Sequence, residues 1–211
     1  MSSGNQPYGD ASTREAILRA TWDLVEEHGA RVRLVDVAER AGVSRQAVYL
    51  HFGDRSGLFR ALVGHMDVAL GVPDLEERVH RAASGLEALE RAVELYAVIA
   101  PRIDRVARVL EAAQHDDAAL AEAWRDRMTL RRVASRAIVE RLAADGRLAH
   151  GWTIEAAADL FYAITLPGVW RELTTVLGWM SDVYRERMTR FLSRALTSSP
   201  ERARDPRITR A

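Results

Sequence analysis

The segment Ala38–Phe52, AERAGVSRQAVYLHF, holds the side chains best suited to bind a polar partner. Gly42 interrupts a short helical pattern, and Ser44 at once opens another helix of about two turns. The second helix carries polar and aromatic hydrogen-bonding side chains, namely Arg45, Gln46, Tyr49 and His51. Because a buried helix pair would need apolar residues at such positions, these side chains indicate contact with something outside the protein.

Ala38 and Gly42 are spaced as in a helix-turn-helix. The small side chain of Ala38 lets two helices cross closely, and Gly42 tolerates the positive φ that the tight turn requires. Ser44 caps the second helix, whose free N–H groups and positive dipole end suit a phosphate. The pattern therefore predicts a helix that enters the major groove of DNA, with Arg45 and Gln46 reaching base edges.

Three further side chains are predicted to contact the phosphate backbone. They are Tyr49 and His51, near the end of the second helix, and Arg55, in the first turn of the next one. Residues 1–66 contain eight arginines and eight acidic residues, so a broadly basic surface is absent. Affinity must then come from local arrangement, which favours a sequence-specific reader over a protein that coats DNA.

Taken with its flanks, the segment resembles the tetracycline-repressor (TetR) family of transcriptional regulators. The similarity runs through TREAILRATWDLVEEHG and VDVAERAGVSRQAVYLHFGDRSGLFRALV, from Thr13 to Val63. The resemblance implies a three-helix DNA-binding domain in which these residues face DNA: Ser44, Arg45, Gln46, Tyr49, His51 and Arg55. A weaker similarity at 173–192 implies the end of a TetR-type ligand-binding domain, whose last two long helices form a dimeric four-helix bundle.

The sequence departs from the family pattern at a few positions. Arg33 and Leu34 stand where Thr or Ser often opens the second helix of the domain, and Leu50 replaces the usual polar residue. Gly57 is a poor helix former early in the fourth helix. These departures keep an alternative open, a ligand-binding or protein-interaction module whose helix-turn-helix no longer binds DNA.

Composition excludes several other classes of function. The 211 residues carry no net charge and no cysteine, and all 30 basic residues are arginine. We expect a cytoplasmic protein without a membrane partner, because no signal peptide is apparent and no apolar run approaches the roughly 20 residues of a membrane span. Motifs of nucleophilic, dinucleotide and P-loop chemistry are absent, and the six histidines lack metal-ligand spacing. We therefore predict no enzyme activity, catalytic residue, metal site or cofactor.

Apolar residues recur at helical spacing between the two ends of the chain, which predicts an all-α fold. The sequence GVP at 71–73 marks the predicted boundary between a DNA-binding domain over 12–70 and a larger helical domain over 74–197. Residues 1–11 and 198–211 are predicted to be flexible tails. Ser12 or Thr13 is predicted to cap the first helix, and Pro101 to end a helix of the larger domain.

The larger domain is predicted to bind a ligand and to dimerise. Five side chains could line an apolar cavity or belong to plain core, namely Tyr96, Trp124, Met128, Phe161 and Trp170. Two apolar-striped helices over 153–166 and 182–197 predict a homodimer. The arginine-dense sequence at 125–132 is interpreted as an exposed face that pairs with Glu122 and Asp126. The predicted function is that of a homodimeric regulator of operator DNA, a repressor relieved by an apolar or amphipathic small molecule.

Overall fold

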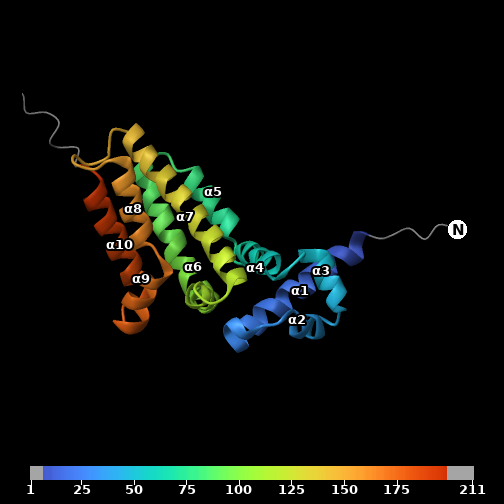
Figure 1. The fold of residues 1–211 in the computed structure, drawn as a ribbon. Helices are drawn as coiled ribbons and strands as arrows, with labels where there is room; N and C mark the ends of the chain where they lie inside the picture. The colour runs from blue at the N-terminus through green and yellow to red at the C-terminus, as the bar shows by residue number, and fades with distance from the viewer. Residues whose placement is uncertain (1–6, 199–211) are drawn as a thin grey trace, which may run out of the picture. The chain divides into compact units, whose positions relative to one another are not determined.

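The computed structural model describes residues 7–198, and within them the secondary structure is helical apart from one isolated bridge between Leu148 and Thr197. The predicted all-α class is confirmed. The helices, labelled in Figure 1, are α1 (Pro7–His28), α2 (Leu34–Ala41), α3 (Arg45–Phe52), α4 (Arg55–Ala69), α5 (Val72–His80), α6 (Gly85–Ala113), α7 (Ala118–Ala144), α8 (Ile154–Ile164), α9 (Pro167–Arg171) and α10 (Ser181–Leu196). A 3-10 turn at Gly29–Arg31 follows α1, and a π-helical turn at Glu172–Val176 follows α9.

The helices pack as two compact units. The first joins the chain up to Val72 with Pro101–Leu130, and the second joins Pro73–Ala100 with the chain from Arg131 onward. Helices α6 and α7 therefore each contribute to both units. The functional domains over 12–70 and 74–197 remain predictions, and the packing places 101–130 with the helix-turn-helix segment.

The first unit has a continuous apolar core. Buried side chains from six helices form it, including Ile17, Leu18, Val25, Val37, Val48, Leu58, Phe59, Leu62, Val106, Leu110 and Leu120. Helix α3 contributes only one buried residue, Val48. A helix of eight residues gains little from its own hydrogen bonds, so contacts with neighbouring helices must hold it in place.

Several predicted helix ends differ from the structure. Helix α1 starts at Pro7, so Ser12 and Thr13 lie inside it and the predicted cap is wrong. Pro101 lies inside α6 and does not end it. An internal proline costs about 3 kcal/mol, but α6 buries Ala100 and Val106 on either side of Pro101, which offsets that cost. The predicted tails fall largely outside the described residues.

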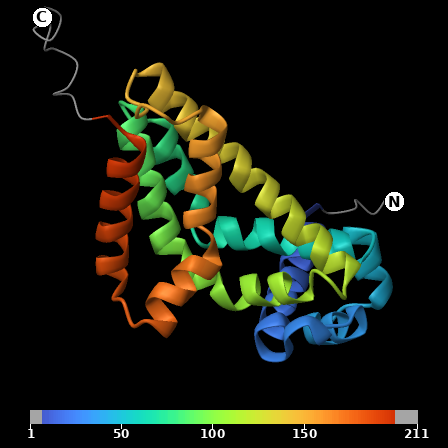
Figure 2. The ribbon, with the colours of Figure 1, turned by 60° about the vertical axis from the view of Figure 1, so that its left-hand side comes forward.

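The second unit is built around another apolar core, which includes Leu89, Val93, Val139, Leu142, Phe161, Tyr184, Leu192 and Leu196. Helices α8 and α10 both supply residues to it, and their axes are close to parallel in both views (Figures 1 and 2). Thr153 caps α8, accepting a hydrogen bond from the Ala156 N–H at 3.2 Å.

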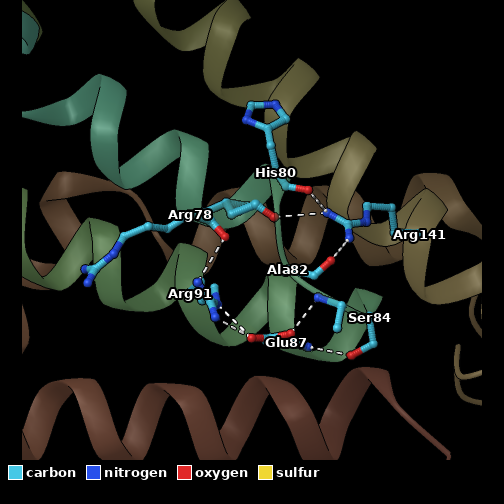
Figure 3. A network of polar contacts seen from close by, with 9 residues as sticks. Arg78, His80, Ala82, Ser84, Glu87, Arg91 and Arg141 are labelled. Atoms are coloured by element: carbon cyan, nitrogen blue, oxygen red, sulfur yellow. Dashed lines mark hydrogen bonds and ion pairs between the residues drawn. The ribbon is translucent and has the colours of Figure 1, made fainter.

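One arginine closes the C-terminal end of α5 (Figure 3). The Arg141 guanidinium, from α7, donates to the carbonyl oxygens of Val79 at 3.0 Å, His80 at 3.2 Å and Ala82 at 2.5 Å. The last carbonyls of a helix have no partner inside the helix. Arg141 therefore satisfies groups that would otherwise be left without hydrogen bonds.

The start of α6 is closed by a reciprocal cap, also drawn in Figure 3. The Ser84 hydroxyl accepts from the Glu87 N–H at 3.2 Å, and the Glu87 carboxylate accepts from the Ala83 N–H at 2.6 Å. The bond from Ala83, followed by the bond from Arg91, lowers the pKa of Glu87. Local polar contacts thus fix the connection between α5 and α6.

Candidate DNA-binding interface

Helices α2 and α3 form the predicted helix-turn-helix. Gly42 adopts the left-handed conformation with φ 68°, and the Val43 N–H donates to the Ala38 carbonyl at 3.0 Å. Ala38 is buried where the sequence predicts a small side chain. The Ser44 hydroxyl accepts from the Ala47 N–H at 3.1 Å and caps α3. The turn therefore has the geometry that its residues predict.

Five of the six predicted DNA-contacting residues lie on α3 or at its cap. Ser44, Arg45, Gln46 and Tyr49 are exposed, and His51 is half-buried. Arg45 Nη2 donates to the Tyr49 hydroxyl at 3.2 Å, and its guanidinium lies 5.5 Å from the centre of the Tyr49 ring. Contacts of these five residues with DNA stay predictions.

Leu50 shares this surface. Its side chain is 79% exposed, and it lies four residues after Gln46, so both project from the same side of α3. The buried Val48 holds the opposite side of the helix. The outer face of α3 therefore combines one amide and one apolar side chain.

The start of α2 explains the departure at Arg33 and Leu34. The Asp36 carboxylate accepts from the Arg33 backbone N–H at 3.2 Å and from the Arg33 guanidinium at 2.9 and 2.6 Å. The guanidinium lowers the pKa of Asp36. Leu34 packs against the core of the first unit. Asp36 thus closes the start of α2 through Arg33 instead of a capping hydroxyl, and α2 forms despite the change at 33–34.

Gly57 is explained by close packing between α3 and α4. A Cβ added to Gly57 would collide with the carbonyl oxygen of Phe52 and lie 3.2 Å from its carbonyl carbon. Phe52 is the last residue of α3, and Asp54 caps α4 by accepting from the Gly57 N–H at 2.7 Å. The weak helix former is therefore the residue that allows α4 to begin so close to the end of α3.

Arg55 is the one predicted DNA-contacting residue that lies outside α3 and its cap, and its side chain bonds to other parts of the first unit. Its guanidinium forms an ion pair with Asp117 and donates to the Ala30 and Val32 carbonyls at 3.0 and 3.3 Å. Its side chain is 26% exposed. The structure brings Arg55 together with the connection between α1 and α2 and with the residue before α7, and not with the exposed face of α3.

The five predicted ligand-binding residues divide between the two units. Tyr96, Phe161 and Trp170 belong to the second unit, where the rings of Tyr96 and Phe161 are 6.3 Å apart. Trp124 and Met128 lie in the first unit, and Trp124 packs against its core. Trp170 is buried and its indole N–H has no hydrogen-bond partner. Ligand contacts of all five stay predictions.

Sequence reasoning missed Arg131. The arginine density of 125–132 predicts an exposed face, but Arg131 is only 8% exposed. Its guanidinium lies 4.0 Å from the centre of the Tyr96 ring and donates to the Thr165 carbonyl at 2.5 Å. A signal was present, because Arg131 and Ser135 continue the stripe of Met128 and Ile138 at intervals of three and four residues.

Between residues 7 and 198 no helix is long and apolar enough to cross a membrane. The same part of the chain has no cluster of three or more acidic, histidine or cysteine side chains arranged to hold a metal ion.

These features define an all-α helix-turn-helix protein. Residues 17–62 match the family model of bacterial regulatory proteins, tetR family. The HTH-type transcriptional repressor BepR of Brucella suis biovar 1 (strain 1330) is 42% identical over 55 residues, which is 26% of each chain. The chain thus matches about a quarter of the length of this curated relative. Residues 17–62 are therefore similar to the DNA-binding part of TetR-family regulators.

Solved structures share the fold over most of the chain. NalD, the secondary repressor of the MexAB-OprM multidrug efflux pump in Pseudomonas aeruginosa, superposes with a TM-score of 0.67 and 24% identity, covering 89% of this chain and 98% of NalD. The regulator FadR from Bacillus subtilis, in complex with stearoyl-CoA, gives a TM-score of 0.68 and 15% identity, covering 86% of this chain and 98% of FadR. At these identities the similarity establishes the fold alone.

Proposed function

We propose that the protein is a sequence-specific, DNA-binding transcriptional regulator that acts as a homodimeric repressor and is relieved by a small molecule. The exposed face of α3 carries this proposal. A capped helix held by one buried side chain presents Arg45, Gln46 and Tyr49 to solvent, as a major-groove reader requires. The family model covers this same part of the chain, and the similarity to BepR, a transcriptional repressor, supports a repressor.

Selection of DNA duplexes from a random-sequence library tests the first part of the proposal. A reader of base edges enriches one related set of sequences, and its specific affinity exceeds its non-specific affinity by a factor of roughly 10³ or more. The alternative is a module whose helix-turn-helix does not bind DNA. It would enrich no sequence, and Leu50 on the outer face of α3 is the feature that favours it.

Replacing Gln46 with alanine should relax the preference at one base position. A bidentate amide contact to adenine contributes about 1–3 kcal/mol of discrimination, so the preferred site should lose roughly that much binding free energy. Tyr49→Phe is the contrasting variant, because loss of a phosphate contact weakens all sequences alike. Binding to a panel of single-base variants measures both effects. An unchanged ranking of sequences in Gln46→Ala would refute the assignment.

The second unit supports an effector site. Tyr96, Phe161 and Trp170 share one apolar cluster, and the buried Trp170 N–H lacks a hydrogen-bond partner. A buried donor without a partner suits a ligand that carries an acceptor. FadR, which has the same fold, holds stearoyl-CoA. We infer that the effector of this chain is amphipathic, with an apolar body and at least one acceptor.

An effector that relieves repression must bind more weakly when operator DNA is present. Allosteric coupling is typically about 1–3 kcal/mol, so effector and operator should weaken each other's binding by the same factor, roughly 5–150-fold. Thermal-shift screening can supply a bound compound, and titrations with and without the selected duplex measure the factor. A compound whose affinity is identical in the two titrations is not an effector.

A further inference from the structure

Arg55 joins three segments of the first unit. It is the first residue of α4 and follows α3 after only Gly53 and Asp54. Its Nη2 donates to the Ala30 carbonyl at 3.0 Å, its Nε donates to the Val32 carbonyl at 3.3 Å, and its Nη1 pairs with Asp117. One guanidinium therefore links the connection between α1 and α2, the start of α4 and the residue before α7.

Asp117 uses both carboxylate oxygens. Oδ1 accepts from the backbone N–H groups of Ala119 at 3.1 Å and Leu120 at 3.2 Å, which caps α7, and Oδ2 accepts from Arg55. Burial alone raises the pKa of Asp117, but the bonds from Arg55 and from the two amides outweigh it, and the pKa lies below its ordinary value. The carboxylate is therefore charged at neutral pH.

The surroundings of Arg55 restrain its side chain further. The guanidinium lies 4.9 Å from the centre of the Phe59 ring, and Phe59 is buried in the core of the first unit. A cation held on an aromatic face, by two carbonyls and by a carboxylate has little freedom to reach a phosphate. The geometry thus opposes the direct DNA contact that the family resemblance implies for this residue.

A second ion pair between α4 and α7 provides a natural comparison. Arg60 pairs with Glu122 at 3.2 Å, and the two side chains are 48% and 41% exposed. The ion pairs of Arg60 are made with two acidic residues of α7, Glu122 and Asp126. Such an exposed ion pair is expected to contribute little to the stability of the fold.

We propose that the Arg55–Asp117 pair is a positioning contact that holds α3 in its DNA-reading orientation against the start of α7. The contact acts through the two-residue link between α3 and α4 and through the carbonyls that precede α2. The inference rests on the proposed DNA-binding function and assigns Arg55 a role within it. Because Asp117 also caps α7, the contact joins the segment that follows α3 to the first turn of that helix.

Paired substitutions test the contact on a duplex selected by the wild-type protein. Asparagine is a good helix cap, so Asp117→Asn keeps the α7 cap and removes only the charge that faces Arg55. We expect Asp117→Asn and Arg55→Gln each to weaken binding roughly 10-fold, within the usual range of coupling between sites. The double variant should be no weaker than either single one, because both remove the same contact.

The direction of the change in affinity and the salt dependence of binding distinguish a positioning role from a phosphate contact. Removing an acidic charge normally strengthens binding to DNA, so a loss of affinity in Asp117→Asn is diagnostic of positioning. The slope of log affinity against log salt should stay unchanged in Arg55→Gln, whereas loss of a phosphate contact would reduce it by about 0.9. The matched variants Arg60→Gln and Glu122→Gln should bind within twofold of wild type, by roughly the worth of an exposed pair.

A different pattern of affinities would refute the positioning role. If Asp117→Asn binds like wild type while Arg55→Gln loses affinity and salt dependence, Arg55 contacts phosphate and the proposal is wrong. Hydrogen exchange without DNA gives a separate readout that survives failure of the proposed function. The amides of Ala47–Phe52 should exchange faster in Asp117→Asn than in Glu122→Gln, and equal rates would overturn the positioning role even if no DNA bound.

Discussion

Replacing Gly57 with alanine should destabilise the first unit and displace α3. The added Cβ would collide with the Phe52 carbonyl oxygen, which is backbone and cannot rotate away as a side chain would. Relief requires α3 and α4 to separate, and forced overpacking typically costs about 1–3 kcal/mol. The melting temperature should fall by roughly 2–4 °C per kcal/mol. Operator affinity should fall as well, because Phe52 ends the helix that reads DNA.

Gly64→Ala is the matched control, because it makes the same change in the same helix. A Cβ at Gly64 would meet nothing within 4 Å. Alanine there should raise stability by roughly 0.5–1 kcal/mol through helix propensity alone, with operator affinity unchanged. Thermal melting and binding to the selected duplex measure both variants. Equal gains in stability at Gly57 and Gly64 would show that the packing against Phe52 is not tight.

The sequence predicts the helix-turn-helix well because its signals are local. The positive φ at Gly42 and the cap at Ser44 each follow from one residue and its near neighbours. Gly57 has no such local signal, because the need for a glycine there depends on how closely α3 approaches α4. The role of Arg55 cannot be predicted locally either, because its partner Asp117 is 62 residues away in the chain.

The helix boundaries of the larger domain are predicted less well for the same reason. Pro101 is a strong local stop signal, yet burial on both sides of it keeps α6 continuous. Helix α5 starts at Val72, directly after Gly71 with φ 71°, so only Leu70 and Gly71 separate α4 from α5 at the predicted domain boundary. Tertiary packing overrides local propensity at these positions.

Arg131 shows how composition can mislead. A stretch with several arginines normally forms a solvated face, and Arg127 and Arg131 instead face inward. Arg127 pairs with Asp67 at 2.6 Å, and burial raises the pKa of Asp67 despite that partner. Helical periodicity, which places Arg131 on the buried stripe of α7, is the better guide here than charge density.

Replacing Phe191 with glutamate should convert a homodimer into a folded monomer. The predicted dimer helices over 153–166 and 182–197 contain Phe161 and Phe191, and the structure separates their roles. Phe191 is 49% exposed on α10, whereas Phe161 is fully buried in the core of the second unit. A charge at Phe191 therefore opposes association without entering the core, and Phe191→Leu is the matched variant that keeps the surface apolar.

Dimerisation matters because two linked reading helices engage two half-sites at once. They would lie about 34–36 Å apart on DNA, or a multiple of that spacing. Losing one of two linked contacts typically weakens binding by roughly 10²–10⁴-fold, so Phe191→Glu should show the largest loss of operator affinity.

Phe161→Glu should instead unfold the second unit, because a buried unpaired charge costs more than about 4 kcal/mol. Sedimentation and circular dichroism distinguish the two outcomes. A wild-type protein that sediments as a monomer at micromolar concentration, or a Phe191→Glu variant that remains dimeric, would place the interface elsewhere or remove it.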